Sequence, residues 1–253
     1  WLIVLILLAG FNLRAQNAYE IKVTLQRFNS GYLYLAHHFG SKQYLIDSAK
    51  LNNNSEAVFT GKEKLFGGVY MIVFPQKNGW IECIIDKEQK FEVVSDTSNM
   101  LAGTTFKGSN DNVLFSGYQK KSYEIGTELA QLRKQASTAG KEDSDKINGR
   151  IAALGNDLQQ YRESFLKDHP DHLLSAIFRV LREPVIPPAA EHPGGKYDSA
   201  YAYQYYKSHY WDGVSFKDER LMRTPVFENK LNRYFNEVLS QSPDTLKVAV
   251  DQA

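Results

Sequence analysis

The residues best suited to chemistry lie in one short segment, residues 201–227, where aromatic rings, a histidine and two arginines follow one another closely. Aromatic side chains three or four positions apart lie on one side of a helix. Arginine beside such rings is a combination that can bind a sugar, a peptide or a carboxylate. The candidate binding residues are Tyr205, Tyr206, His209, Tyr210, Trp211, Arg220 and Arg223.

The same residues can equally be packing residues of a helical domain. A stripe of Tyr and Trp rings buries well against neighbouring helices while the hydroxyl groups stay in water. Arg220 and Arg223 can then bond helix-end carbonyls or nearby carboxylates such as Asp218. The pattern favours packing, and binding remains the alternative.

Other polar clusters do not form a catalytic pattern. His169 and His172 flank a helix start in "HPDH" without a third ligand at zinc-site spacing, so we expect a solvated helix junction. His37 and His38 are adjacent on a predicted strand and face opposite ways. The sequence holds no G-x-S-x-G, H-E-x-x-H or phosphate-binding loop. We assign no catalytic residue, metal ligand or cofactor, and expect that this chain is not an enzyme.

Cys83 is the only cysteine, so the chain cannot form an internal disulfide or a C-x-x-C redox pair. In "WIECIID" it alternates in phase with Ile81 and Ile85, which places all three on one strand face. We therefore predict a buried thiol that takes no part in chemistry.

The charge balance argues against nucleic acid as a partner. Thirty Lys and Arg residues stand against 29 Asp and Glu residues, a formal net charge of +1. A nucleic-acid-binding protein needs a surplus of positive charge. The hydrophobic content of 43% and charged content of 23% are those of a folded globular protein.

The first 15 residues have the pattern of an export signal. An apolar run over residues 1–11 is too short for a membrane helix, which needs about 20 residues, and fits a secretory core of ~7–15. We predict cleavage near Ala15 and no integral membrane span afterwards. Since no Met or basic segment precedes Trp1, we expect the sequence to be truncated at its start.

Residues 16–107 are predicted to be an antiparallel β-sandwich or open barrel. In "YEIKVTLQRF" apolar and polar residues alternate, and six more short apolar runs follow at hairpin spacing up to residue 95. Turn-forming segments separate these runs, and in "KNG" Asn78 and Gly79 suit a type I′ turn. Regular short strands of this kind are typical of sandwiches and barrels.

Residues 108–253 are predicted to be helical, which makes the whole chain α+β. Helical spacing indicates an αα-hairpin over residues 109–168, with Ser109 or Asn110 as its first cap. Pro170, Pro225 and Pro243 each stand at a helix start, with Thr224 and Ser242 as caps. The further predicted helices cover residues 170–182, 198–211, 225–239 and 243–253, with a proline-rich loop over 183–199.

Two segments resemble parts of a known group of proteins. "YEIKVTLQRFNSGYLYLAHHFGSKQYLIDSAKL", with "GGVYMIVFP" and "FKGSNDNVLF", resembles the β-rich domain of unknown function at the N-terminus of exported thioredoxin-like proteins. "YYKSHYWDGVSFKDERLMRTPVFENKLNRYF" is similar to the helical segment that follows there. The resemblance covers most of residues 18–253. It implies a periplasmic or cell-envelope location in a Gram-negative bacterium and a downstream thioredoxin-like domain that this sequence does not include.

Two functions are consistent with these observations. The first is a non-catalytic accessory region of an exported thiol–disulfide oxidoreductase, which positions the redox domain in cis or an exported client protein. The second is a stand-alone cell-envelope binding module for glycan or peptide, using a sheet face or the Tyr/Arg segment. A downstream C-x-x-C domain in the intact gene would favour the first.

Overall fold

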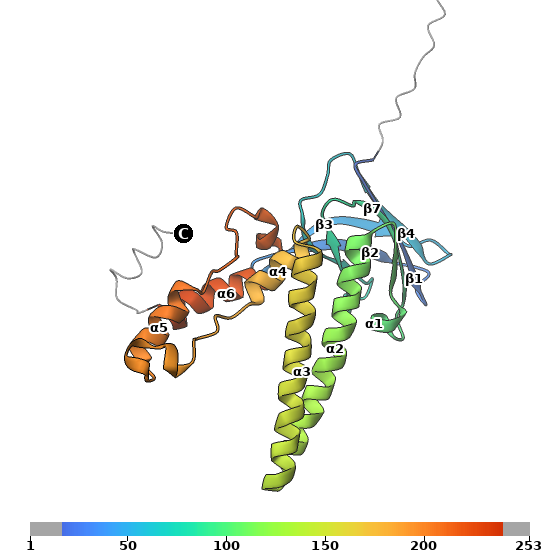
Figure 1. The fold of residues 1–253 in the computed structure, drawn as a ribbon. Coiled ribbons are helices and arrows are strands. Elements are labelled where there is room, and N and C mark those ends of the chain that lie inside the picture. The colour runs from blue at the N-terminus through green and yellow to red at the C-terminus, as the bar shows by residue number, and fades with distance from the viewer. Residues whose placement is uncertain (1–16, 240–253) are drawn as a thin grey trace, which may run out of the picture.

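The computed structural model describes residues 17–239, in which two β-sheets are followed by a helical region (Figure 1). The α+β fold class predicted from the sequence is confirmed. The predicted export signal over residues 1–15 and the predicted helix over 243–253 lie outside the described residues. No described helix is both long enough and apolar enough to cross a membrane.

The first sheet has the strand order β4-β1-β7-β8. Its strands are β4 (Glu56–Gly61), β1 (Tyr19–Gln26), β7 (Lys90–Asp96) and β8 (Thr105–Lys107). Strands β1 and β7 pair in parallel, whereas the other pairs of this sheet are antiparallel. The sandwich is therefore not wholly antiparallel. A parallel pair needs a long crossover connection, and the chain between β1 and β7, which includes the whole second sheet, supplies it.

The second sheet has the order β3-β2-β5-β6, and all its pairs are antiparallel. Its strands are β3 (Lys42–Lys50), β2 (Tyr32–Phe39), β5 (Gly68–Val73) and β6 (Trp80–Ile85). Strand β6 is an edge strand, and the loop before it differs from the predicted type I′ turn. The positive φ falls on Lys77 (55°), and neither Asn78 nor Gly79 has one.

The inner faces of the two sheets form the first hydrophobic core. Alternation along β1 buries Ile21, Val23 and Leu25 against residues of the second sheet such as Ile72 and Cys83. Cys83 is fully buried, as its phase with Ile81 and Ile85 predicted. Burial raises the pKa of its thiol, so the thiolate needed for redox chemistry is strongly disfavoured.

The helical region begins with an αα-hairpin that projects from one side of the sandwich (Figure 1). Its helices are α2 (Asn110–Ala136) and α3 (Lys141–Asp168). Ser109 caps α2 by accepting from the N–H of Asn112, which confirms the first of the two predicted caps. The remaining helical segments are α1 (Met100–Gly103), α4 (Leu173–Leu181), η1 (Ala189–Glu191), η2 (Pro193–Gly195), α5 (Ser199–Ser208), η3 (Glu219–Arg223), α6 (Phe227–Arg233) and η4 (Tyr234–Val238).

The start of α6 differs from the prediction. The helix begins at Phe227 with Val226 as its cap, and Val226 makes no side-chain capping bond. Thr224 instead ends η3, where its hydroxyl donates to the Leu221 carbonyl (2.7 Å). A Thr-Pro pair places the threonine in extended backbone in either position, so the sequence pattern does not distinguish a helix end from a helix start.

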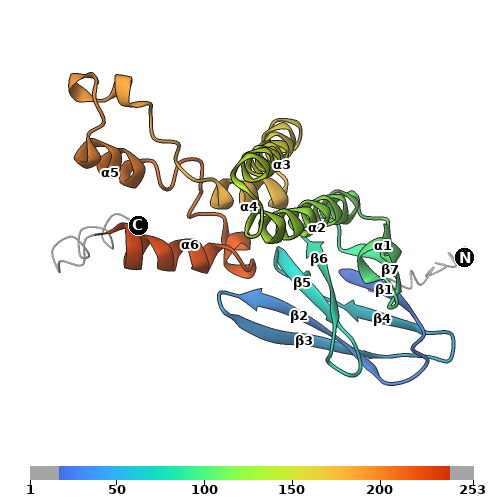
Figure 2. The ribbon, with the colours of Figure 1, turned by 90° about the horizontal axis from the view of Figure 1, so that it is seen from below.

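A second hydrophobic core joins the helices to the outer face of the second sheet, and the helices lie on that side of the sandwich (Figure 2). Val69 on β5 and Ile84 on β6 pack with Phe115 of α2 and with residues of α4, including Phe178. Strand β5 is consequently buried on both faces. The sheet and the helices share a continuous apolar interior rather than a wet boundary.

Candidate binding site

The candidate residues from the sequence fall into two separate groups. The aromatic members lie on α5 and the turn after it, whereas Arg220 and Arg223 lie on η3, which packs against β2 and β5. The structure thus separates the rings from the arginines, although they are close in sequence.

The aromatic group contacts α6 and the proline-rich loop. Tyr206 donates to Glu183 (2.5 Å) and accepts from Arg233 (3.2 Å); burial and then the Glu183 carboxylate raise the pKa of Tyr206. Tyr210 is buried and donates to the carbonyl of Lys230 (3.1 Å). Each hydroxyl has a partner within the chain, so these two rings connect α5 to neighbouring segments.

Lys230 completes this aromatic cluster. Its ammonium lies 4.4 Å from the centre of the Tyr210 ring and 5.8 Å from that of Trp211, and it donates to the Arg182 carbonyl (2.7 Å). Burial lowers its pKa. His209 stacks on Tyr205 with ring centres 3.9 Å apart. The rings are occupied by one another and by an internal cation, and ligand binding by them remains a prediction.

The arginine group ties η3 to the second sheet. Arg220 makes two hydrogen bonds to Asp218 (2.8 and 2.7 Å) and one to Asp86 at the end of β6 (2.6 Å). These carboxylates raise the pKa of Arg220, so it stays charged. Arg223 lies 4.5 Å from the centre of the Phe66 ring. Both guanidinium groups have partners inside the protein.

The histidine pair has a structural role in the described part of the chain. His172 caps α4 by accepting from the Leu174 N–H (3.0 Å), and its other ring nitrogen lies 3.2 Å from Asp111 on α2. The contact with His172 lowers the pKa of Asp111. His169 packs on Phe165. No group of metal-ligating side chains suited to a metal ion occurs among residues 17–239.

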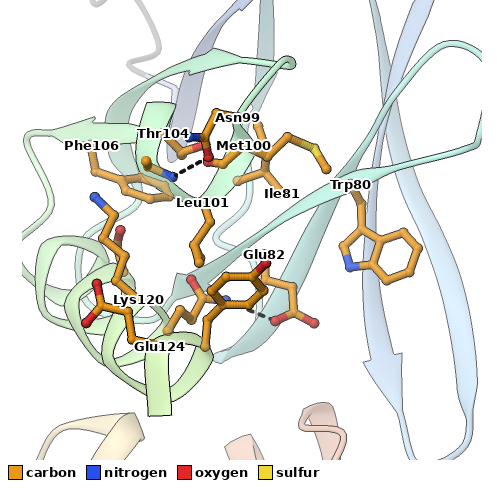
Figure 3. Close-up of a pocket in the computed structure, with 14 residues that line it drawn as sticks. Trp80, Ile81, Glu82, Asn99, Met100, Leu101, Thr104, Phe106, Lys120 and Glu124 are labelled. Atoms are coloured by element: carbon orange, nitrogen blue, oxygen red, sulfur yellow. Dashed lines mark hydrogen bonds between the residues drawn. The ribbon is translucent and has the colours of Figure 1, made fainter. Parts of the chain in front are cut away.

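A cleft of about 790 Å³ lies between β6, α1 and α2 (Figure 3). It lies on the side of the sandwich where the edge strands β6 and β8 approach α2. Side chains from all these elements surround it. The lining residues are Trp80, Ile81, Glu82, Asn99, Met100, Leu101, Ala102, Thr104, Phe106, Ser116, Gln119, Lys120, Tyr123 and Glu124.

The cleft has an apolar floor and an aromatic rim. Ile81 and Phe106 reach it from the sandwich core, and Leu101 points into its centre (Figure 3). At the rim, Trp80 and Tyr123 are 51% and 64% exposed. Large aromatic side chains held in solvent at the mouth of an apolar cleft are typical of a binding site.

Hydrogen bonds hold the α1 wall of the cleft in place. Asn99 caps α1 by accepting from the Ala102 N–H (3.3 Å). Thr104 donates to the Met100 carbonyl (2.6 Å), and its hydroxyl also lies 2.7 Å from that of Ser95 on β7. On the opposite side, Gln119 of α2 donates to the Glu82 carboxylate (3.1 Å). The cleft is therefore formed before any ligand enters.

Sequence reasoning missed this cleft, since its walls come from four elements, β6, α1, β8 and α2, that are brought together only by the fold. One signal was present. Trp80 alternates with buried Ile81 and Cys83, so it had to lie on the opposite strand face, where an exposed indole needs an explanation.

Two family matches cover most of the chain in order. Residues 19–115 match a domain of unknown function (DUF4369), and residues 141–253 match a second domain of unknown function (DUF5106). The first match ends inside α2, and the second begins at the first residue of α3. Neither description names an activity. No curated protein and no solved structure matched the chain.

Proposed function

We propose that this chain is a non-catalytic accessory region of an exported thiol–disulfide oxidoreductase, and that it holds a polypeptide in the cleft between β6, α1 and α2. The polypeptide is a client of the redox domain or a segment of that domain. The role is binding, because the one thiol of the chain is buried in the sandwich core with a raised pKa.

The observation that carries the proposal is the cleft itself. A cleft of about 790 Å³ that has an apolar floor, with exposed Trp80 and Tyr123 at its rim, can bury several side chains of a polypeptide. The periplasmic or cell-envelope location is part of the same proposal and rests on the apolar N-terminal run and on the resemblance described above.

The alternative function, a stand-alone cell-envelope binding module, is retained only with a peptide as its ligand. Glycan binding by the segment around α5 is less favoured, because its rings pack on each other and on Lys230. A peptide ligand would use the same cleft in either setting.

The test is binding of an unfolded polypeptide, fluorescein-labelled alkylated insulin B chain, followed by fluorescence anisotropy. Binding should raise the anisotropy to a plateau as protein is added. Ser116→Trp, which fills the cleft from α2, should abolish the rise, while Ser137→Trp outside the cleft should leave it unchanged. Equal binding by all three proteins, or by none, would contradict the proposal. The same chain should show no insulin reductase activity.

A further inference from the structure

Strand β6 is an edge strand, and part of its outward edge lies along the cleft. In an antiparallel pair, residues alternate between bonding their neighbour strand and pointing away from it. The Phe74 N–H donates to the Gly79 carbonyl across the β5–β6 hairpin, so residues 81, 83 and 85 bond β5 in turn. The N–H and C=O groups of Trp80, Glu82 and Ile84 consequently point away from the sheet.

Asn112 occupies the outward groups of Ile84. Its side-chain carbonyl accepts from the Ile84 N–H (2.7 Å), and its amide donates to the Ile84 carbonyl (2.8 Å). One carboxamide thus takes the place of a neighbouring strand at that position. It also marks where the edge stops being open, because the first turn of α2 covers the strand at Ile84.

The edge before that point is open. Within residues 17–239, no hydrogen bond satisfies the outward groups of Trp80 or Glu82, and both residues line the cleft. An exposed strand edge is a template for an added strand, which most sheets cover or blunt. Here the open part coincides with the apolar cleft rather than with bulk solvent.

We infer that the cleft binds an extended polypeptide segment that adds as a strand to β6 at Trp80 and Glu82. This inference rests on the proposed function and names the form in which the polypeptide binds. Main-chain bonds to an edge give affinity, while side chains of alternate residues enter pockets and give specificity.

The side chains of β6 define the sequence that fits. A residue opposite Ile81 would point into the apolar floor beside Leu101 and Phe106, which favours a large apolar side chain. A residue opposite Glu82 would lie on the other face beside its carboxylate. Opposite charges are favourable across a strand pair, and the lining has two carboxylates, Glu82 and Glu124, against the one ammonium of Lys120. The segment therefore alternates apolar and basic residues.

The test uses a fluorescein-labelled hexapeptide of alternating phenylalanine and lysine. A second peptide carries the same side chains but is methylated on all its backbone nitrogens. It therefore cannot donate a main-chain hydrogen bond to β6 in either register. Fluorescence anisotropy with the full chain should give saturable binding of the first peptide. The second should bind about tenfold or more weakly, since each lost hydrogen bond weakens binding severalfold.

Two substitutions test the same edge from the protein side. Glu82→Pro removes the outward N–H without removing a β5–β6 bond, a change that an edge strand tolerates, and should weaken binding of the first peptide by about tenfold. Glu82→Gln keeps the N–H and should weaken binding of this peptide by only about two- to threefold. Circular dichroism of both variants checks folding, and the methylated peptide on wild-type protein keeps the test valid if Glu82→Pro unfolds.

The outcomes separate this inference from the proposed function. Equal binding of the methylated peptide, with binding still lost in Ser116→Trp, would overturn strand addition and leave a polypeptide-binding cleft. Failure of both the peptide and the insulin B chain to bind would overturn both. Sedimentation that showed a wild-type dimer and a monomeric Glu82→Pro chain would assign the edge to a second copy, and that too would overturn the inference.

Discussion

The side chain of Asn112 bonds both backbone groups of Ile84, at 2.7 and 2.8 Å, and so joins the first turn of α2 to the edge of the second sheet. A third bond, from the same amide to Ser109 (3.0 Å), fixes the carboxamide orientation. The residue is fully buried. This link aligns α2 with β6, and that alignment creates one side of the cleft.

Removing this link should destabilise the protein strongly. In Asn112→Ala, the N–H and C=O of Ile84 lose their partners in a buried place, which should cost about 2–4 kcal/mol. Urea denaturation measures the loss. Asn110→Ala is the matched control, because Asn110 is exposed in the same helical turn and should change stability by less than about 0.5 kcal/mol. Similar effects of the two changes would argue against the link.

Close packing of η3 on the second sheet can be tested at a glycine. A Cβ on Gly68 would overlap the Cβ of Arg223 and lie 3.0 Å from its carbonyl oxygen. Gly68→Ala should therefore lower the free energy of unfolding by about 1–3 kcal/mol. Gly117→Ala, in an open part of α2, should instead raise it by about 0.5–1 kcal/mol. If Gly68→Ala left the free energy of unfolding unchanged, η3 would not pack on the second sheet as described.

The Arg220–Asp218 pair predicts how stability depends on acid. Bonds to Arg220 lower the pKa of Asp218 below the unfolded value of 3.8. The stabilisation is thus fully present above about pH 4 and is lost as the pH falls through the folded pKa. Asp218→Asn should be less stable at neutral pH and should lose less stability on acidification. Parallel pH profiles for the two proteins in urea denaturation would refute this role.

Burial of Cys83 predicts a thiol that reacts only after unfolding. Its side chain is fully buried and its pKa is raised, so a thiol reagent should label native protein at least about 100-fold more slowly than protein in concentrated guanidinium chloride. Cys83→Ala should leave peptide binding unchanged. Rapid labelling of native protein would reopen a redox role for this residue.

The elements that the sequence predicted well are those with a strong local period. Alternation in β1 and helical spacing in α2 and α3 were each sufficient, since one face of each element is buried. The parallel pairing of β1 with β7 was missed, because local alternation is the same for either direction of a partner strand. The short elements α1 and β8 were missed because three or four residues carry no period.

The candidate site was less predictable for a related reason. In the alternative that this segment binds a ligand, its residues would form one pocket, but Tyr206 and Arg220 turn toward different partners, Glu183 and Asp86, that are distant in sequence. The cleft likewise depends on which strand becomes an edge. Pairing order is a tertiary property, so the exposure of Trp80 indicates a site only once β6 is known to be an edge strand.

Amide hydrogen exchange at β6, followed by NMR with and without the phenylalanine–lysine hexapeptide, tests the central claim most directly. The Ile84 N–H, bonded to Asn112, should be protected in both states. The Glu82 N–H should exchange readily in the free protein and become at least about tenfold more protected when the peptide binds. Saturable peptide binding that leaves exchange at Glu82 unchanged would contradict strand addition at this edge.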